Sequence, residues 1–379
     1  MTREVTAIDL FCGAGGLSEG LHQAGFHVLA GNDFDERAGA TYARTHHEAR
    51  FLGGPIQNLS TQDFLSAARL KPGQLDVLAG GPPCQAYSVY NHQRGMHDER
   101  SFLFREYLRL VEALSPRWVI MENVMGILSA GGGAAVQAIT EGFRKLGYEI
   151  DFRVLKAEQF GVPQERRRVV FIGNRTGDPI VFPEATHGPD LKPYTTVFDA
   201  ISDMPVLDNG GAWLSDAYGT APQSAYQAEL RQGTPGVRNH SAPKLSKVNE
   251  ERMKHIPRGG SWRDVPHDLL PAGMKQARRC DHTKRYGRLD WGGLSSTILT
   301  KCDIHWGAYI HPDQNRSLTV REAARFQSFP DWFEFEGSRT EQFVQVGNAV
   351  PPMLGRAIGE TLLRVQAEAR GAGGMKRAA

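Results

Sequence analysis

The sequence is poor in cysteine and has no long hydrophobic run. Its 379 residues include four cysteines, Cys12, Cys84, Cys280 and Cys302, and no Cys-x-x-Cys pair. This spacing argues against a zinc ribbon or a disulfide framework and favours a reducing, cytoplasmic setting with no bound metal. Asp9 interrupts the only apolar stretch near the N-terminus. We therefore expect neither a signal peptide nor a membrane span.

The sequence also lacks a strong excess of one charge. Its formal net charge is +2, so any basic surface must be local. Residues 275–288 hold six Lys and Arg against one Asp, and Trp262, Trp291 and Trp306 lie nearby in the chain. Basic side chains interleaved with aromatic ones suit a phosphate backbone and base edges. A solvated charged surface is the alternative interpretation.

The N-terminal residues predict a strand at 5–10, a glycine-rich turn at 11–16, a helix at 17–24 and a strand at 28–30. Asp33 follows Gly13 by about 20 residues, the spacing at which an acid accepts ribose hydroxyls while the turn and helix N-terminus bind a ligand. Ser18 stands where a dinucleotide fingerprint has its third glycine. The pattern therefore favours an adenosine-containing cofactor other than a nicotinamide.

Residues 75–79 predict a buried strand that leads into Gly81-Pro82-Pro83-Cys84. The two prolines fix φ and hold the thiol in one direction, which suits a nucleophile. A buried cysteine under a proline turn is the alternative. Residues 118–121 predict another strand, which brings Glu122 to the same sheet edge, unless Glu122 is a solvated loop residue. The polar residues 87–100 predict a loop long enough to close over a site.

Six motifs occur in a fixed order along the chain. They are Asp9-Leu10-Phe11-Cys12-Gly13-Ala14-Gly15-Gly16, Gly81-Pro82-Pro83-Cys84-Gln85, Glu122-Asn123-Val124, Gln164-x-Arg166-x-Arg168, Arg321-Glu322-x-x-Arg325 and Gln345-x-Gly347-Asn348. Pro-Cys or Glu-Asn-Val alone would be common by chance, but the ordered set is highly specific. It resembles the cytosine-5 DNA methyltransferase family of bacterial and phage type. The resemblance spans the chain except for the variable segment at roughly 180–290.

The resemblance implies an α/β fold: a doubly wound, Rossmann-like methyltransferase domain with a smaller, irregular target-recognition domain. We expect residues 1–185, completed by 340–379, to form the catalytic domain that binds S-adenosyl-L-methionine. Residues 186–315 would form the target-recognition domain, and residues 316–339 a hinge and return segment.

The resemblance also implies a cofactor site. The residues expected to bind S-adenosyl-L-methionine are Phe11, Gly13, Ala14, Gly15, Gly16, Asp33, Phe34, Ile56, Gly81, Pro83, Leu103 and Asn348. Asp33 would accept the ribose hydroxyls and Phe34 would lie on the adenine. One departure is Gly54-Pro55-Ile56, where the family often has Gly-Asp-Ile. The carboxylate for the adenine amino group is therefore missing at Pro55.

The chemistry that the resemblance implies assigns four catalytic residues. Cys84 would add to carbon 6 of cytosine, Glu122 would protonate ring nitrogen 3, Arg168 would hold the oxygen at carbon 2, and Arg166 would support the loop or backbone. The target base would be flipped out of the duplex. The residues expected to contact DNA are Gln85, Ser88, Gln93, Arg100, Arg285 and Thr297.

Double-stranded DNA is thus the expected partner, with a possible cognate restriction endonuclease and a monomeric enzyme. Three alternatives remain open. The chain could methylate tRNA, although a recognition insert of over a hundred residues favours duplex DNA. It could be a non-catalytic DNA-binding homologue, although Cys84, Glu122 and Arg168 are all present. A nicotinamide oxidoreductase is the third, and the imperfect fingerprint speaks against it.

Overall fold

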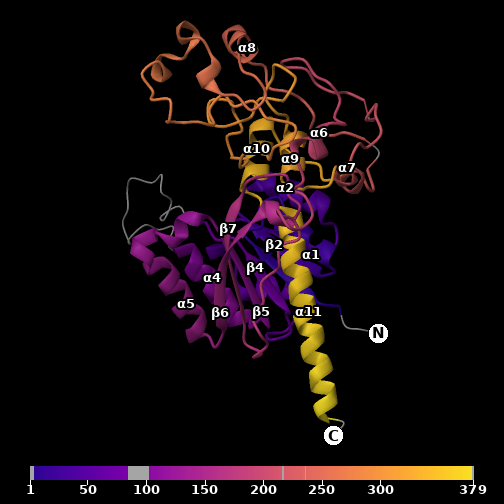
Figure 1. Cartoon of the computed structure of the whole chain (residues 1–379). Helices are drawn as coiled ribbons and strands as arrows, with labels where there is room; N and C mark the ends of the chain where they lie inside the picture. Colours follow the sequence, from indigo (N-terminus) through magenta and orange to yellow (C-terminus); the bar gives the residue numbers. More distant parts are fainter. Residues whose placement is uncertain (1–3, 84–101, 216, 235, 378–379) are drawn as a thin grey trace. The chain divides into compact units, whose positions relative to one another are not determined.

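The computed structural model describes residues 4–83, 102–215, 217–234 and 236–377 (Figure 1). The chain forms two compact units. The first unit comprises Met1–Lys156, Arg167–Ala185 and Val350–Ala379, and the second comprises Ala157–Arg166 and Thr186–Ala349. Both units are therefore assembled from segments that are distant in sequence. In the described parts of the chain, no helix has the length and apolar character needed to cross a membrane.

The first unit is built on a seven-stranded sheet with the order β3-β2-β1-β4-β5-β7-β6. The neighbouring pairs from β3 to β5 are parallel, and β7 runs antiparallel to both β5 and β6. The predicted doubly wound α/β fold is confirmed, and the sequence did not predict β3. The strands are β1 (Thr6–Leu10), β2 (His27–Asp33), β3 (Arg50–Gly53), β4 (Val77–Gly80), β5 (Trp118–Asn123), β6 (Glu149–Lys156) and β7 (Arg167–Asn174).

Helices cover this sheet, and several begin at ordinary capping residues. Asp35 accepts the Arg37 and Ala38 N–H groups at the start of α2, and Ser60 forms a capping box at the start of α3. The helices of the unit are α1 (Gly16–Ala24), α2 (Glu36–Thr45), α3 (Thr61–Ala68), α4 (Phe102–Leu114), α5 (Ala134–Lys145) and α11 (Pro352–Arg377), with 3₁₀ turns at Ile56–Asn58, Met125–Leu128 and Ala130–Gly133.

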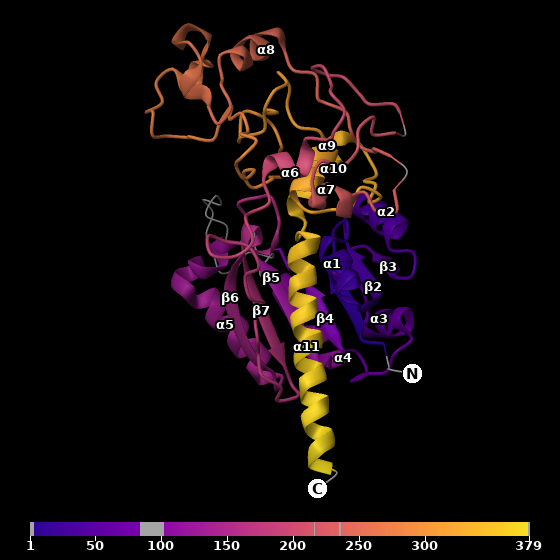
Figure 2. The ribbon, with the colours of Figure 1, turned by 45° about the vertical axis from the view of Figure 1, so that its right-hand side comes forward.

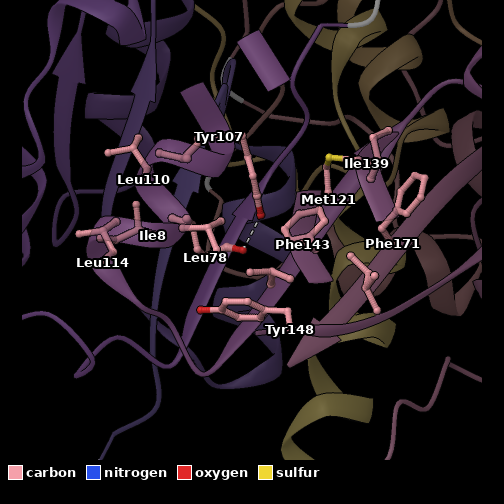
Figure 3. Packing of buried hydrophobic residues seen from close by; sticks show 14 of the residues in the cluster. Ile8, Leu78, Tyr107, Leu110, Leu114, Met121, Ile139, Phe143, Tyr148 and Phe171 are labelled. Carbon is pink, nitrogen blue, oxygen red and sulfur yellow. Dashed lines mark hydrogen bonds between the residues drawn. The ribbon is translucent and has the colours of Figure 1, made fainter. Parts of the chain in front are cut away.

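Helices α3, α4 and α5 share one hydrophobic core with the strands (Figure 3). The Tyr107 ring from α4 packs against Phe143 of α5 at a centroid distance of 5.9 Å. Its hydroxyl lies 2.8 Å from Leu78 O on β4 and 3.0 Å from Ile120 O on β5. The only polar atom of this buried side chain is therefore bonded to the backbone, as burial requires.

Helix α11 lies along α1, far from it in sequence (Figure 2). Glycines allow the two helices to pack closely: a Cβ on Gly20 would lie 2.4 Å from the backbone oxygen of Pro352, and one on Gly359 would lie 2.7 Å from Ala24 Cβ. Helix α11 thus packs on the first unit, to which Val350–Ala379 belong. Because the close approach needs glycine, larger residues at Gly20 would force the helices apart.

A buried polar group joins α1 to β1. Ser18 Oγ donates to Asp9 Oδ2 at 2.7 Å and lies 3.1 Å from the Tyr42 hydroxyl of α2. Asp9 and Ser18 are both buried. Burial, with smaller contributions from Asp33 and Glu122, raises the pKa of Asp9 from its ordinary value of 3.8 to about 7. The position that lacks the fingerprint glycine is thus occupied by a serine that binds a buried acid.

The second unit has short helices and long irregular connections. One hydrophobic core contains Met253, Trp262, Tyr286, Ile304 and Ile310, which come from segments spread over about sixty residues. The helices of the unit are α6 (Val197–Ile201), α7 (Ala225–Leu230), α8 (Lys247–Lys254), α9 (Val320–Phe326) and α10 (Arg339–Asn348), with 3₁₀ turns at Ala157–Phe160, Trp262–Asp264, His267–Leu269 and Ala272–Met274. Residues 316–349 belong to this unit.

Buried ion pairs fix α9 in the second unit. Arg325 donates to Asp331 at 2.6 Å and to Asp203 at 2.5 Å, and Arg316 donates to Glu322 at 2.7 Å. All five side chains are fully buried. Loss of one partner would leave a buried charge uncompensated, which costs about 3–5 kcal/mol. The Arg-Glu-x-x-Arg motif of the sequence is thus a packing element in this structure.

We predict that Asp9→Asn stabilises the chain relative to wild type, and that this difference grows from about pH 4 to about pH 7. The folded state binds the Asp9 proton more tightly than the unfolded state, so this group's contribution to stability falls as pH rises through that window. The slope is at most about 1.4 kcal/mol per pH unit. Urea unfolding at several pH values measures the difference.

Tyr107→Phe is the matched control, because burial raises the pKa of that phenol above its usual range and it does not titrate in the window. Tyr107→Phe should lower the free energy of unfolding by about 1 kcal/mol, the contribution of one buried hydrogen bond, and this decrease should be the same at every pH. A pH-independent difference for Asp9→Asn would contradict the prediction.

Candidate active site

The glycine-rich turn after β1 is held by the acid at the end of β2. Gly13 N donates to Asp33 Oδ2 at 2.8 Å, and Asp35 N donates to Asp33 Oδ1 at 2.9 Å. Phe11 and Gly13 have φ values of 56° and 53°, so the turn uses left-handed backbone that glycine favours. Burial raises the pKa of Asp33. The predicted spacing between Gly13 and Asp33 thus brings the two residues into direct contact.

Glycine is also required at position 15 of the turn. Gly15 has a φ of 101°, and a Cβ there would lie 2.4 Å from His46 Cε1 and 2.9 Å from the Tyr42 ring. Tyr42 and His46 are stacked with ring centroids 4.5 Å apart. Ala14 is buried and Gly16 is the first residue of α1. The sequence did not identify the two rings beneath the turn, because nothing local links them to it.

The residues expected around adenine lie beside this turn. Phe34, directly after Asp33, is 69% exposed, which leaves its ring face open to a ligand. Gly54 N donates to Asp33 O at 3.0 Å, and Ile56 is buried. Pro55 lies between them. Leu103, at the start of α4, packs on the edge of the hydrophobic core.

These side chains fit an adenosine ligand. A carboxylate has about four acceptor sites, and Asp33 uses some of them for the backbone N–H groups of Gly13, Asp35 and Phe34, so a hydroxyl group can still be bound. Phe34 offers a flat apolar surface. Among the described residues there is no group of three or more His, Cys, Asp or Glu that could hold a metal ion.

Three strands bring the expected catalytic groups to one edge of the sheet. The Gly81 position faces Glu122, since a Cβ there would lie 3.2 Å from Glu122 Oε2. Asn123 Nδ2 donates to Pro82 O at 3.0 Å. Arg168 Nε lies 2.7 Å from Glu122 Oε1, and both side chains are largely buried. The structure thus brings Glu122 and Arg168 together beside the Pro82–Pro83 turn.

Five of the predicted residues, Cys84, Gln85, Ser88, Gln93 and Arg100, lie outside the described residues. Pro83 is described and precedes Cys84 directly.

The other cysteines differ in their suitability as nucleophiles. Cys12 and Cys302 are buried, and burial raises the pKa of each thiol well above its usual range. Their thiolates are therefore disfavoured, and the thiolate is the reactive form. Cys280 is exposed. Its sulfur lies 3.8 Å from Asp281 Oδ1, a negative charge that disfavours the thiolate.

The remaining predicted residues belong to the second unit. Arg166 is buried and donates to three backbone carbonyls, including Gly347 O at 3.1 Å. Asn348 ends α10 and is exposed. Thr297 Oγ1 donates to Glu165 O at 2.5 Å. The Arg285 guanidinium lies over the exposed Trp306 ring, 5.2 Å from its centroid.

The basic segment 275–288 presents fewer cations than its sequence suggests. Arg288 is buried and donates to Ile256 O and Met253 O at 2.7 Å. Arg278 forms an ion pair with Asp281, and Lys284 lies 3.5 Å from Glu165. The charge count therefore overestimated the basic surface, because one arginine is used inside the unit.

Comparison with known proteins agrees with this geometry. The C-5 cytosine-specific DNA methylase family matches residues 5–364. The Type II methyltransferase M.AgeI of Thalassovita gelatinovora is 35% identical, over 94% of this chain and 98% of its own length. The Type II methyltransferase M1.HphI of Haemophilus parahaemolyticus is also 35% identical, over 95% of this chain and 87% of its own length.

A solved structure of a prophage-encoded protein from E. coli, described as a DNA modification methyltransferase, has a TM-score of 0.73 and 26% identity. The match covers 96% of this chain and all of that one. The fold, the order of the motifs and the pairing of Glu122 with Arg168 are thus accompanied by similarity along nearly the whole chain. This chain belongs to the C-5 cytosine-specific DNA methylase family.

Proposed function

We propose that this cytosine-5 DNA methylase transfers a methyl group from S-adenosyl-L-methionine to carbon 5 of a cytosine that is flipped out of a specific duplex DNA sequence. The observation that carries the proposal is the contact of Arg168 Nε with Glu122 Oε1 at 2.7 Å beside Gly81. This contact fixes the Glu122 carboxyl at the end of β5. Its neighbour β4 leads in sequence to Pro83 and Cys84. In the proposed mechanism this acid meets the base to which Cys84 is bonded.

The proposed chemistry must make carbon 5 of cytosine nucleophilic. Cytosine is aromatic, so carbon 5 is a poor nucleophile. The Cys84 thiolate forms a bond to carbon 6, the π electrons move toward nitrogen 3, and Glu122 gives nitrogen 3 a proton. Arg168 orients the Glu122 carboxyl and holds the oxygen at carbon 2, where negative charge also develops. The ring is then an enamine, with a nucleophilic carbon 5.

The final steps restore the aromatic ring. When bound, S-adenosyl-L-methionine supplies an electrophilic methyl group. After carbon 5 is methylated, its proton leaves to water and the C6–S electron pair returns to Cys84 as the bond breaks. Glu122 takes back the nitrogen 3 proton. The chain thus ends in its starting protonation state.

Most of the residues proposed to bind the cofactor belong to the first unit. Asp33 would accept the ribose hydroxyls, the Gly13–Gly16 turn would approach the methionine end, and Phe34 would lie on the adenine. Backbone near Pro55, such as the Gly54 carbonyl, would have to serve the adenine amino group in place of a side chain. Asn348 stays a predicted cofactor residue.

Duplex DNA is the proposed partner, with residues 186–315 as the target-recognition segment. The relatives named Type II methyltransferases motivate the further proposal that a cognate restriction endonuclease exists. A monomeric state and a cytoplasmic location stay predictions.

Asp33→Ala should weaken S-adenosyl-L-methionine binding by roughly 1.5–3 kcal/mol, the scale of hydrogen bonds to a charged group. Titration calorimetry measures the affinity. Asp35→Asn is the control, because that side chain caps α2 and an asparagine oxygen can keep the cap. Equal affinity in wild type and Asp33→Ala would remove Asp33 from the cofactor site.

Exchange of roughly residues 190–310 for the matching segment of a relative should change which DNA sequence is methylated and leave the chemistry intact. The reason is that Glu122, Arg168 and the glycine-rich turn lie outside the exchanged segment. Bisulfite sequencing of DNA from cells that express the chimera shows the modified sites. Methylation at the original sites would place recognition elsewhere in the chain.

A duplex with 5-fluorocytosine at the target should trap the enzyme covalently. Fluorine cannot leave carbon 5 as a cation, so the methylated base should stay bonded to Cys84 and survive a denaturing gel. The trap should require S-adenosyl-L-methionine, because methylation precedes the blocked step. Cys84→Ser should abolish it, since a serine hydroxyl is largely un-ionised and less nucleophilic than a thiolate.

Cys280→Ser is the control for the trap, because Cys280 is the exposed cysteine of the described residues and should be dispensable. Mass spectrometry then identifies the bonded residue. An adduct on Cys12, Cys280 or Cys302, or none with a verified target duplex, would contradict the assignment of Cys84.

A further inference from the structure

Two loops of the second unit meet at a pair of buried anchors. Tyr286 N donates to Ile304 O at 2.7 Å. Both side chains are buried in the hydrophobic core of this unit, so each loop is fixed where it leaves the core. Arg285 precedes the first anchor, and Trp306 follows the second by two residues. The anchors thus bring these two side chains together, with the Arg285 guanidinium 5.2 Å from the centroid of the Trp306 ring.

The turn that carries Trp306 is tight, yet its ring is exposed. Trp306 N donates to Asp303 O at 2.9 Å, and His305 N donates to Asp303 Oδ1 at 2.8 Å. Glycine is needed directly after the ring, because a Cβ on Gly307 would lie 2.6 Å from the Tyr309 side chain. Trp306 is nevertheless 54% exposed. The backbone is therefore held in one shape while a large flat side chain stays open to a ligand.

Arg285 differs from the other arginines of its basic segment in the use of its side chain. Arg278 pairs with an aspartate, Arg279 donates to a backbone carbonyl, and Arg288 is buried and donates to several carbonyls. Among the described residues, the Arg285 guanidinium forms neither a hydrogen bond nor an ion pair. Its N–H donors stay available to a ligand, and its contact with the Trp306 ring limits where they point.

A guanidinium held in this way suits the edge of a base better than a phosphate. Neutralising a phosphate needs only a positive charge within reach, which a flexible lysine also supplies. Guanine presents O6 and N7 side by side in the major groove, and the planar fork of an arginine can donate to both. Because both N–H groups must point at these two atoms at once, a ring that restrains the guanidinium lowers the cost of forming this contact.

We propose that Arg285 reads one guanine of the target duplex in the major groove, and that Trp306 is a positioning residue that holds the Arg285 guanidinium for this contact. We call these two residues the Arg–Trp pair. The inference rests on the proposed function, which supplies duplex DNA as the ligand. Both residues belong to the second unit, within the segment proposed to recognise the target.

The test measures which duplexes the full-length enzyme methylates. Purified wild type, Arg285→Ala and Trp306→Ala each act on a pool of duplexes of randomised sequence, and bisulfite sequencing identifies the methylated sites. Wild type should require guanine at one position, and both variants should relax the requirement at that same position. The preference for guanine there should fall about tenfold, the scale of discrimination by a bidentate arginine. The other positions should stay as selective as in wild type.

A base analogue tests the contact at a single atom. 7-Deazaguanine lacks the N7 acceptor that arginine would use. At the relaxed position, the analogue should lower kcat/KM of wild type about tenfold and that of Arg285→Ala no further, because the contact is already absent in the variant.

A conservative variant separates positioning from a purely structural role. Trp306→Phe keeps a ring beside the guanidinium and should recover most of the guanine preference that Trp306→Ala loses. It also keeps the proposal testable if Trp306→Ala does not fold.

Arg278→Ala is the matched control. It removes an arginine of the same basic segment, whose side chain is 80% exposed and paired with Asp281. This change should leave the preference for guanine as in wild type. A similar relaxation in Arg278→Ala would show that the charge of the segment, rather than the Arg–Trp pair, sets the preference.

Three further results would overturn the inference. Equal loss of activity on every duplex would make Arg285 a phosphate contact. A full guanine preference in both Arg285→Ala and Trp306→Ala would place the readout elsewhere. Relaxation at two different positions would show that the two residues do not act as a pair. Wild-type enzyme that methylates no duplex at all would instead overturn the proposed function, on which this inference rests.

Discussion

The pairing of β5 on its two sides is the constraint on which the candidate active site depends. β5 runs parallel to β4, with Gly80 beside Met121, and antiparallel to β7, with Glu122 beside Val170. The carboxyl ends of β4 and β5 therefore lie at the edge where β7 begins. A parallel β7 would carry Arg168 to the opposite edge. The antiparallel strand is what allows Arg168 to meet Glu122.

A second theme is the use of buried polar side chains to hold backbone in place. In the first unit Ser18 joins Asp9 to Tyr42 beneath the glycine-rich turn. In the second unit Arg166 holds the carbonyls that flank Asn348. Burying such a group costs free energy unless all its hydrogen bonds form, and they form only in one geometry. These residues therefore specify the shape of loops that hydrophobic packing alone would leave less defined.

The same residue type has different uses at positions that look alike in sequence. Arg168 pairs with an acid, Arg166 binds carbonyls, and Arg288 sits inside the second unit although it belongs to a basic cluster. The resemblance predicted roles for Arg166 and Arg168, and composition placed Arg288 in a basic cluster. Neither predicted the partners of these side chains, which for Arg166 lie more than a hundred residues away in the chain.

The sequence by itself determined the central strands of the sheet and the identity of the central motifs. Apolar runs and glycine turns predicted β1, β2, β4 and β5, because strand periodicity and turn geometry are local properties. The contact of Gly13 with Asp33 also followed from a local βαβ unit. Only the tertiary structure decided the direction of β7, the rings under Gly15 and the contact of Arg166 with the carbonyls that flank Asn348. These depend on burial and pairing between distant segments, which a single sequence does not encode in any local pattern.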